Sequence, residues 1–130
     1  RGLTRGKGLV GPVKRFGISL KSHKSEKGVR RPGSLGPWHP ARVTFRVPMA
    51  GQLGMFTRIS YNIPIIARGA AGEHIPATHG FKHYGPITSQ YFVLSGSVQG
   101  SPKRVLVLTP AFRPTKKQAK KKYEFMEVKL

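Results

Sequence analysis

The sequence predicts a mainly β protein: a small antiparallel β-barrel with a long irregular basic extension. Short runs of β-branched and aromatic residues lie between residues 41 and 108, and 16 Gly and 11 Pro interrupt the chain of 130 residues. The formal net charge of +20 comes mostly from the two ends. The apolar share of 38 % is below the roughly 45–50 % of an ordinary globular domain. We therefore expect a small core.

Residues 1–36 have neither a helical nor a strand period, and we expect an extended arm or long loop. Glycine recurs throughout, with Pro12 and Pro32, and interrupts regular structure. Basic residues stand between these breaks, so an anionic partner is expected to order the arm. Residues 1–50 contain twelve of them: Arg1, Arg5, Lys7, Lys14, Arg15, Lys21, Lys24, Lys27, Arg30, Arg31, Arg42 and Arg46.

A first strand is predicted where Val43, Phe45 and Val47 alternate with polar residues, the period of a half-buried strand. Residues 55–66 form a second β-rich run. Pro64 within it indicates an edge position or a bulge, because proline has no N–H for the ladder.

The second half of the chain predicts a loop over residues 67–90, where Gly and Pro cluster. Residues 91–98 and 104–108 are predicted strands, and the five residues between them suit a hairpin loop. Residues 115–122 are helix-friendly but lack an apolar stripe. Several short strands separated by Gly/Pro turns are typical of a small barrel.

The charge balance points to nucleic acid. There are 24 Lys plus Arg against four acids, all Glu, and such an imbalance causes self-repulsion in a free globule. Binding to the closely spaced phosphates of a nucleic acid removes this self-repulsion. A membrane surface would require an amphipathic helix or an apolar span of about 20 residues, and the sequence has neither. We also expect no signal peptide, because residues 1–20 lack an apolar region.

Trp38, the only tryptophan, stands in a Gly-Pro-Trp-His-Pro setting. It can stack on an unpaired base, which is worth about 1–3 kcal/mol. The alternative is a core anchor against the first strand, and the residues alone favour neither. His39 can bond a phosphate or a 2′-OH, or instead a local backbone carbonyl.

Metal binding and catalysis find little support. Cysteine is absent, which excludes disulfides and thiolate sites. His74, His79 and His83 are irregularly spaced in a loop, so zinc is not expected. The four Glu are scattered and form no acid–base pair.

Four stretches, in order along nearly the whole chain, resemble the archaeal and eukaryotic form of the ribosomal protein L3 family (uL3). They are Arg5 to Phe16, Pro37 to Val43 (PWHPARV) followed by Ala50-Gly51-Gln52, Gly80 to Gly85 (GFKHYG) and Leu94 to Arg104 (LSGSVQGSPKR). The resemblance implies a six-stranded barrel of the translation-protein type and a part in early subunit assembly. It also implies an extension, the tryptophan finger, which runs through rRNA toward the peptidyl transferase centre.

By position the finger is about Leu3 to Arg42, with Trp38 at its tip. Eukaryotic family members carry a modifiable histidine where this chain has Glu26, so that modification is not expected here. Family members are much longer, and the match is to their C-terminal part. The N-terminal strands of the barrel are then missing or lie on a separate chain.

We therefore predict three parts: a rRNA-penetrating arm over 1–40, a barrel portion over 41–114 and a basic tail over 115–130. Expected partners are large-subunit rRNA, neighbouring proteins of the subunit and the remaining part of the same protein as a separate segment. No cofactor, membrane partner or enzymatic activity is expected, and the expected location is the cytoplasmic ribosome.

The lysines after Thr115 belong to the predicted rRNA contacts, because like charges four residues apart oppose an isolated helix and favour a phosphate partner over a solvated face. Charge alone fits a free nucleic-acid chaperone or compaction protein equally well. The predicted rRNA-binding residues are Arg5, Lys7, Lys14, Arg15, Lys21, Lys24, Lys27, Arg30, Arg31, Trp38, His39, Arg42, Lys103, Arg104, Lys116, Lys117, Lys120 and Lys121.

Overall fold

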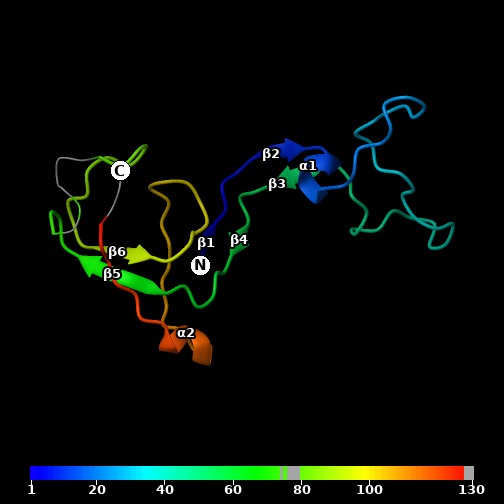
Figure 1. Ribbon diagram of the computed structural model, residues 1–130. Helices are drawn as coiled ribbons and strands as arrows, with labels where there is room; N and C mark the ends of the chain where they lie inside the picture. Colours follow the sequence, from blue (N-terminus) through cyan, green and yellow to red (C-terminus); the bar gives the residue numbers. More distant parts are fainter. Residues whose placement is uncertain (74, 76–79, 128–130) are drawn as a thin grey trace. The chain divides into compact units, whose positions relative to one another are not determined.

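The computed structural model describes residues 1–73, 75 and 80–127, and that part of the chain contains six short strands and two short helices (Figure 1). In order they are β1 (Gly2–Leu3), β2 (Gly8–Val10), α1 (Pro12–Phe16), β3 (Gly51–Leu53), β4 (Thr57–Arg58), β5 (Ile65–Gly69), β6 (Tyr91–Leu94) and α2 (Lys116–Lys120).

The strands form small antiparallel sheets. β1 pairs with β4, β2 with β3, and β5 with β6, each as a two-stranded ladder. The prediction of a mainly β chain is confirmed at this level. These ladders do not join into a closed barrel within the described residues.

Internal contacts divide the chain into two compact units. The loop unit is Arg5–Phe56, and the sheet unit combines Arg1–Thr4 with Thr57–Leu130. Each is described by itself below.

The β2–β3 ladder is the base of the loop unit. Gly8 lies opposite Leu53, and the Lys7 N–H donates to the Leu53 carbonyl at 2.9 Å. Gly54, directly after β3, is buried and has a φ of 75°. A Cβ at this position would collide with the carbonyl of Arg5. Position 54 therefore requires glycine for its backbone conformation and for the close approach of two chain segments.

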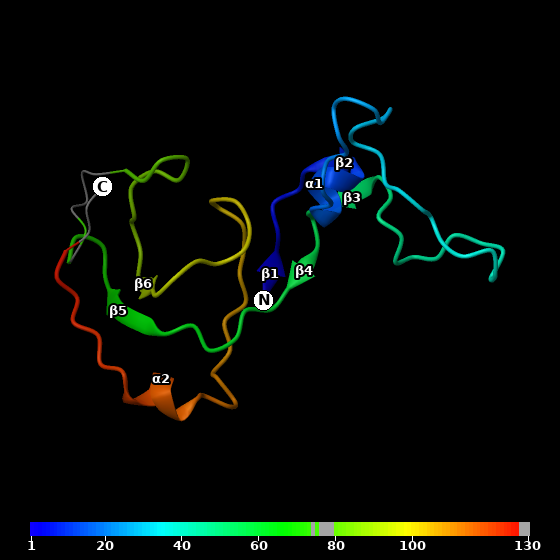
Figure 2. The same ribbon diagram turned by 45° about the vertical axis from the view of Figure 1, so that its right-hand side comes forward.

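α1 begins immediately after β2, although residues 1–36 gave no helical signal. Pro12 occupies the first helical turn, where an amide N–H is not needed. Gly17 ends the helix with a φ of 69°, and its N–H donates to the Val13 carbonyl at 2.9 Å. In Figure 2, α1 lies beside β2 and β3, and residues 18–50 continue as an irregular segment, which we call the long loop.

The strand predicted around Val43, Phe45 and Val47 is wrong, because this segment lies in the long loop. The Val47 N–H donates to the Thr44 carbonyl at 3.3 Å, as in a turn. The Val43 and Phe45 side chains are 53 % and 107 % exposed. A strand needs a partner ladder, and none of the described strands pairs with these residues.

The β5–β6 ladder is the largest in the sheet unit. Its register shifts between Ile65 and Ala67, directly after Pro64, which confirms the predicted edge or bulge. The Ser95 N–H donates to the Pro64 carbonyl at 2.9 Å and extends the pairing past β6. The strand predicted over residues 91–98 is confirmed for Tyr91–Leu94.

The strand predicted over residues 104–108, and its hairpin with β6, are wrong. β6 pairs with β5 instead. Val107 exchanges two bonds with the first residue: its N–H donates to the Arg1 carbonyl at 3.0 Å, and the Arg1 ammonium donates to its carbonyl at 2.9 Å. The Val105 and Val107 side chains are 81 % and 55 % exposed, so this apolar run has no buried face to hold it as a strand.

Few of the described apolar side chains of the sheet unit are buried. Side-chain hydrogen bonds therefore stabilise much of it. Gln99 donates through Nε2 to the Arg58 carbonyl at 2.7 Å and accepts from the Ser60 hydroxyl at 2.9 Å. Ile75, 5 % exposed, is the buried apolar side chain of the described part of the chain. The expected small core is confirmed.

Candidate nucleic-acid interface

The long loop displays a series of cations. Its backbone has neither a helix nor a strand, so its side chains are presented by turns. All of its Lys and Arg are exposed except Lys21, which is half-buried. They are Lys21, Lys24, Lys27, Arg30, Arg31, Arg42 and Arg46.

A closed turn organises the first of these cations. The Lys21 N–H donates to the Val29 carbonyl at 3.1 Å and closes the turn. Inside it, the Glu26 carboxylate accepts the Ser22 N–H at 2.8 Å. The one acidic side chain of the loop is thus engaged with the backbone of the turn that displays two of the lysines.

Trp38 lies in the long loop with its indole 88 % exposed. The alternative of a core anchor is therefore wrong. His39, its neighbour, is also exposed. The preceding backbone is turned by Ser34, whose hydroxyl lies 3.4 Å from both the N–H and the carbonyl oxygen of Gly36. An exposed indole offers an open face for stacking.

Arg15 differs from the other predicted contacts, because its guanidinium is bonded to protein. Nε donates to the Gln52 carbonyl at 3.1 Å, and a terminal nitrogen donates to the Met49 carbonyl at 3.0 Å. By contrast, Arg5, Lys7 and Lys14 in the same unit are exposed.

The remaining predicted contacts lie in the sheet unit and are exposed. Lys103 and Arg104 lie in a turn closed by the Arg104 N–H, which donates to the Ser101 carbonyl at 3.2 Å. Lys121 follows α2. All five residues of α2 are exposed, including Lys116, Lys117 and Lys120.

Two hydrogen bonds tie the tail to one residue. Asn62 donates through Nδ2 to the Arg113 carbonyl at 3.1 Å, and its own carbonyl accepts Gln118 Nε2 at 3.4 Å. Thr115 caps α2, since its hydroxyl oxygen accepts the Gln118 N–H at 3.3 Å. Lys116, Lys117 and Lys120 are therefore carried on a short anchored helix.

Arg46 and Phe45 are exposed in the long loop, although neither is among the predicted rRNA contacts. Both were assigned to a strand, where Phe45 would face a core. Pro48, so soon after the alternating residues, was a signal against a strand that continues into a sheet.

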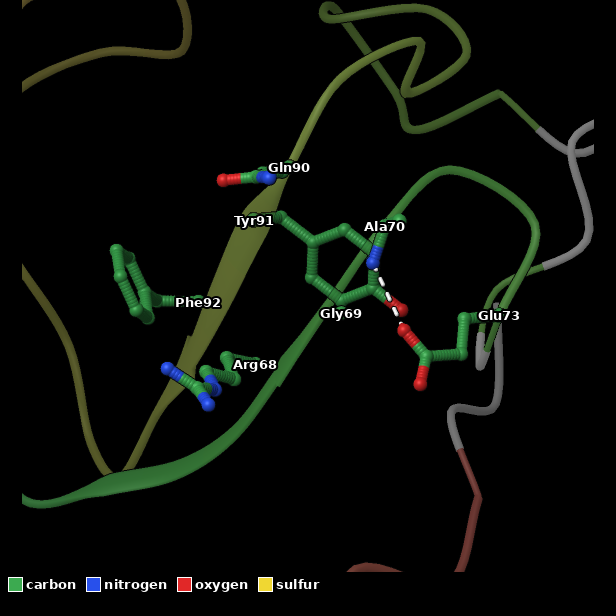
Figure 3. A pocket seen from close by; sticks show the side chains of 7 residues that line it. All are labelled: Arg68, Gly69, Ala70, Glu73, Gln90, Tyr91 and Phe92. Carbon is green, nitrogen blue, oxygen red and sulfur yellow. Dashed lines mark hydrogen bonds between the residues drawn. The ribbon is translucent and has the colours of Figure 1, made fainter.

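A pocket of about 340 Å³ in the sheet unit lies outside this set (Figure 3). Arg68 and Phe92, cross-strand partners of β5 and β6, line it together with Glu73. The Glu73 carboxylate accepts the Ala70 N–H at 2.9 Å. A carboxylate in the pocket disfavours an RNA phosphate there.

The described residues contain no group of three metal-ligating side chains. His83 is exposed at a φ of 64°, while His74 and His79, considered above for zinc, lie outside the described residues. Neither helix in the described part of the chain has the length or apolar content needed to cross a membrane.

Exposed cations and an exposed indole on a chain with little core define a class of basic proteins that have little order of their own and suit an anionic partner. The comparison with known families agrees: the chain belongs to the ribosomal protein L3 family, whose family model matches residues 1–129.

Archaeal relatives named "Large ribosomal subunit protein uL3" match most of the chain. Those of Methanocaldococcus jannaschii, Methanococcus vannielii and Archaeoglobus fulgidus are 49 %, 46 % and 46 % identical over 115, 114 and 117 residues. These alignments cover 87 %, 86 % and 88 % of this chain and 34 %, 34 % and 35 % of the relatives. The chain thus spans about a third of the length of the curated relatives it matches.

Proposed function

We propose that the chain is a structural constituent of the large ribosomal subunit that binds rRNA and catalyses no reaction. The exposed long loop, with its cations around an 88 % exposed Trp38, carries the proposal. Membership of the ribosomal protein L3 family supports it. The cytoplasmic ribosome is the corresponding location.

Within this proposal, residues 1–40 are the arm that penetrates rRNA toward the peptidyl transferase centre, and residues 115–130 are a second basic contact. Lys and Arg neutralise phosphates, and Arg additionally bonds them through its fork. Trp38 stacks on an unpaired base. Phe45, 107 % exposed in the same loop, is a second stacking side chain.

Residues 41–114 are, in this proposal, part of a barrel whose other strands come from the rest of the family protein. A groove of about 640 Å³ in the sheet unit supports this, because apolar side chains such as Ile59, Leu94 and Leu106 line it. Such a surface is stabilised when other apolar segments cover it. Neighbouring ribosomal proteins are further partners at the subunit surface.

Co-sedimentation with large subunits tests the proposal, with the chain carried in a full-length protein. A subunit constituent remains in the particle at high salt, because RNA and protein contacts surround it. A free chaperone or compaction protein, which the net charge of +20 also fits, is removed. With about ten phosphate contacts, the logarithm of the association constant of such a protein for nucleic acid falls by roughly 7–9 for each tenfold rise in salt. Loss from the particle on washing contradicts the proposal.

A further inference from the structure

One guanidinium joins the two ends of the long loop. Arg15, in the last turn of α1, donates from Nε to the Gln52 carbonyl at 3.1 Å and from a terminal nitrogen to the Met49 carbonyl at 3.0 Å. These acceptors lie 37 and 34 residues further along the chain. A single side chain before the loop thus bonds the backbone near the loop's far end, at Met49, and the backbone of β3, at Gln52.

The strand ladder does not reach this far. Its last pair is Val10 with Gly51, after which the chain turns at Gly11 into α1. Met49 precedes β3 and therefore lies beyond the ladder. Arg15 extends the closure of the loop past the point where strand pairing ends.

Gly51 and Phe16 both lie close to the guanidinium. A Cβ at Gly51 would lie 2.7 Å from its central carbon, so any other residue there would displace the guanidinium. On its own helix, the guanidinium carbon lies 5.1 Å from the centre of the Phe16 ring, within cation–π distance. Arg15 and Gly51 lie in two of the stretches that resemble the ribosomal protein L3 family, and the structure brings them together.

We infer that Arg15 is a positioning residue that clamps the base of the long loop and so orients Trp38 for RNA, rather than a phosphate ligand. The inference rests on the proposed rRNA-binding function. A lysine cannot replace Arg15 in this role. The guanidinium holds two N–H donors in one rigid plane and so reaches both carbonyls, whereas a lysine ammonium is a single point of charge. A phosphate ligand, in contrast, keeps its positive charge in Arg15→Lys and therefore retains more of its binding there than in Arg15→Gln.

The clamp itself can be measured without RNA, by water exchange of arginine Nε–H groups in the full chain. The Arg15 Nε–H should exchange about three- to tenfold more slowly than those of the exposed Arg30 and Arg31, because opening its hydrogen bond must come first. Exchange as fast as at Arg30 overturns the inference, whatever the chain binds.

The positioning role is tested in assembled large subunits by chemical probing of rRNA. Trp38→Ala first defines the nucleotides that Trp38 protects. Arg15→Lys and Gly51→Ala should reproduce most of that change while the protein stays in the particle. Arg68→Lys is the matched control for an arginine-to-lysine change, because Arg68 lies in the sheet unit and outside the proposed rRNA contacts.

Retained protection in Arg15→Lys, with loss only in Arg15→Gln, makes Arg15 a phosphate ligand and overturns the inference. If Trp38→Ala changes no nucleotide, the proposed function fails and the orienting role fails with it. Slow exchange at Arg15 then still establishes the clamp, so the two failures are distinguishable.

Discussion

The long loop and the C-terminal tail are both strongly basic, but they are attached differently. The loop leaves and re-enters one ladder, and the Arg15 fork bonds its re-entering end. The tail is tied at its start, through Asn62 and the cap of α2. A segment held at both ends can orient one particular side chain, whereas a segment held at one end supplies charge. We therefore expect loss of the tail lysines to change the salt dependence of binding, and substitutions of Trp38 or of the base of the loop to change stacking or local order.

The largest expected effect is loss of charge from the tail. Changing Lys116, Lys117, Lys120 and Lys121 together to Gln should lower the slope of log K against log salt by about 3, which is on the order of 10³-fold in affinity at 0.1 M salt. Binding of the full chain to a large-subunit rRNA fragment measures this. The same four positions changed to Arg form the charge-matched control. An unchanged slope means that the tail does not contact phosphate.

Next is Gly54→Ala at the base of the loop. Its φ of 75° and the close approach of the Arg5 carbonyl should make alanine destabilising by about 3 kcal/mol. Hydrogen exchange of the Lys7 amide, bonded to Leu53, should then become roughly 100-fold faster. Gly33→Ala should leave it unchanged. Equal protection in both variants contradicts the assigned strain.

Trp38→Ala comes third. Loss of base stacking should weaken binding by about 1–3 kcal/mol and leave the salt slope unchanged, because no charge is removed. Trp38→Phe, which keeps an aromatic face, should restore most of the affinity. Phe45→Ala should have a smaller effect in the same direction. A changed slope without weaker binding contradicts a stacking role.

The smallest expected effect is that of Thr115→Ala. Its hydroxyl caps the Gln118 N–H, and loss of an N-cap destabilises a helix by about 1 kcal/mol. Amide chemical shifts should report partial loss of α2, while affinity for RNA hardly changes, since the lysines remain. Thr115→Ser keeps the cap and should behave as the parent chain. A large loss of affinity shows that helical order, beyond charge, matters in the tail.

Composition and motifs predicted the class of this chain correctly, whereas the positions of its strands were predicted less well. The charge distribution and the Trp38 stretch led to the family, and the bulge near Pro64 and β6 were predicted correctly. The segments around Phe45 and Val105 carry strand-like apolar residues, yet no described strand pairs with them. The alternation of apolar and polar residues predicts which side chains of a strand would be buried. Whether the strand forms depends on a neighbouring strand to pair with.

The clamp was beyond sequence reasoning for a different reason. Arg15 is one of twelve basic residues in the first fifty, and its acceptors are backbone carbonyls that every residue possesses. Local patterns do not show a contact across 37 residues. The one sequence feature related to this contact is the glycine at position 51, which leaves room for the guanidinium.

The slight burial around Ile75 has a consequence for calorimetry. The heat capacity of unfolding grows with the apolar surface that unfolding exposes. Ile75 is the buried apolar side chain of the described residues, so the free chain should melt over a broad range with a small heat-capacity step. Once RNA is bound, melting of the chain should follow that of the nucleic acid.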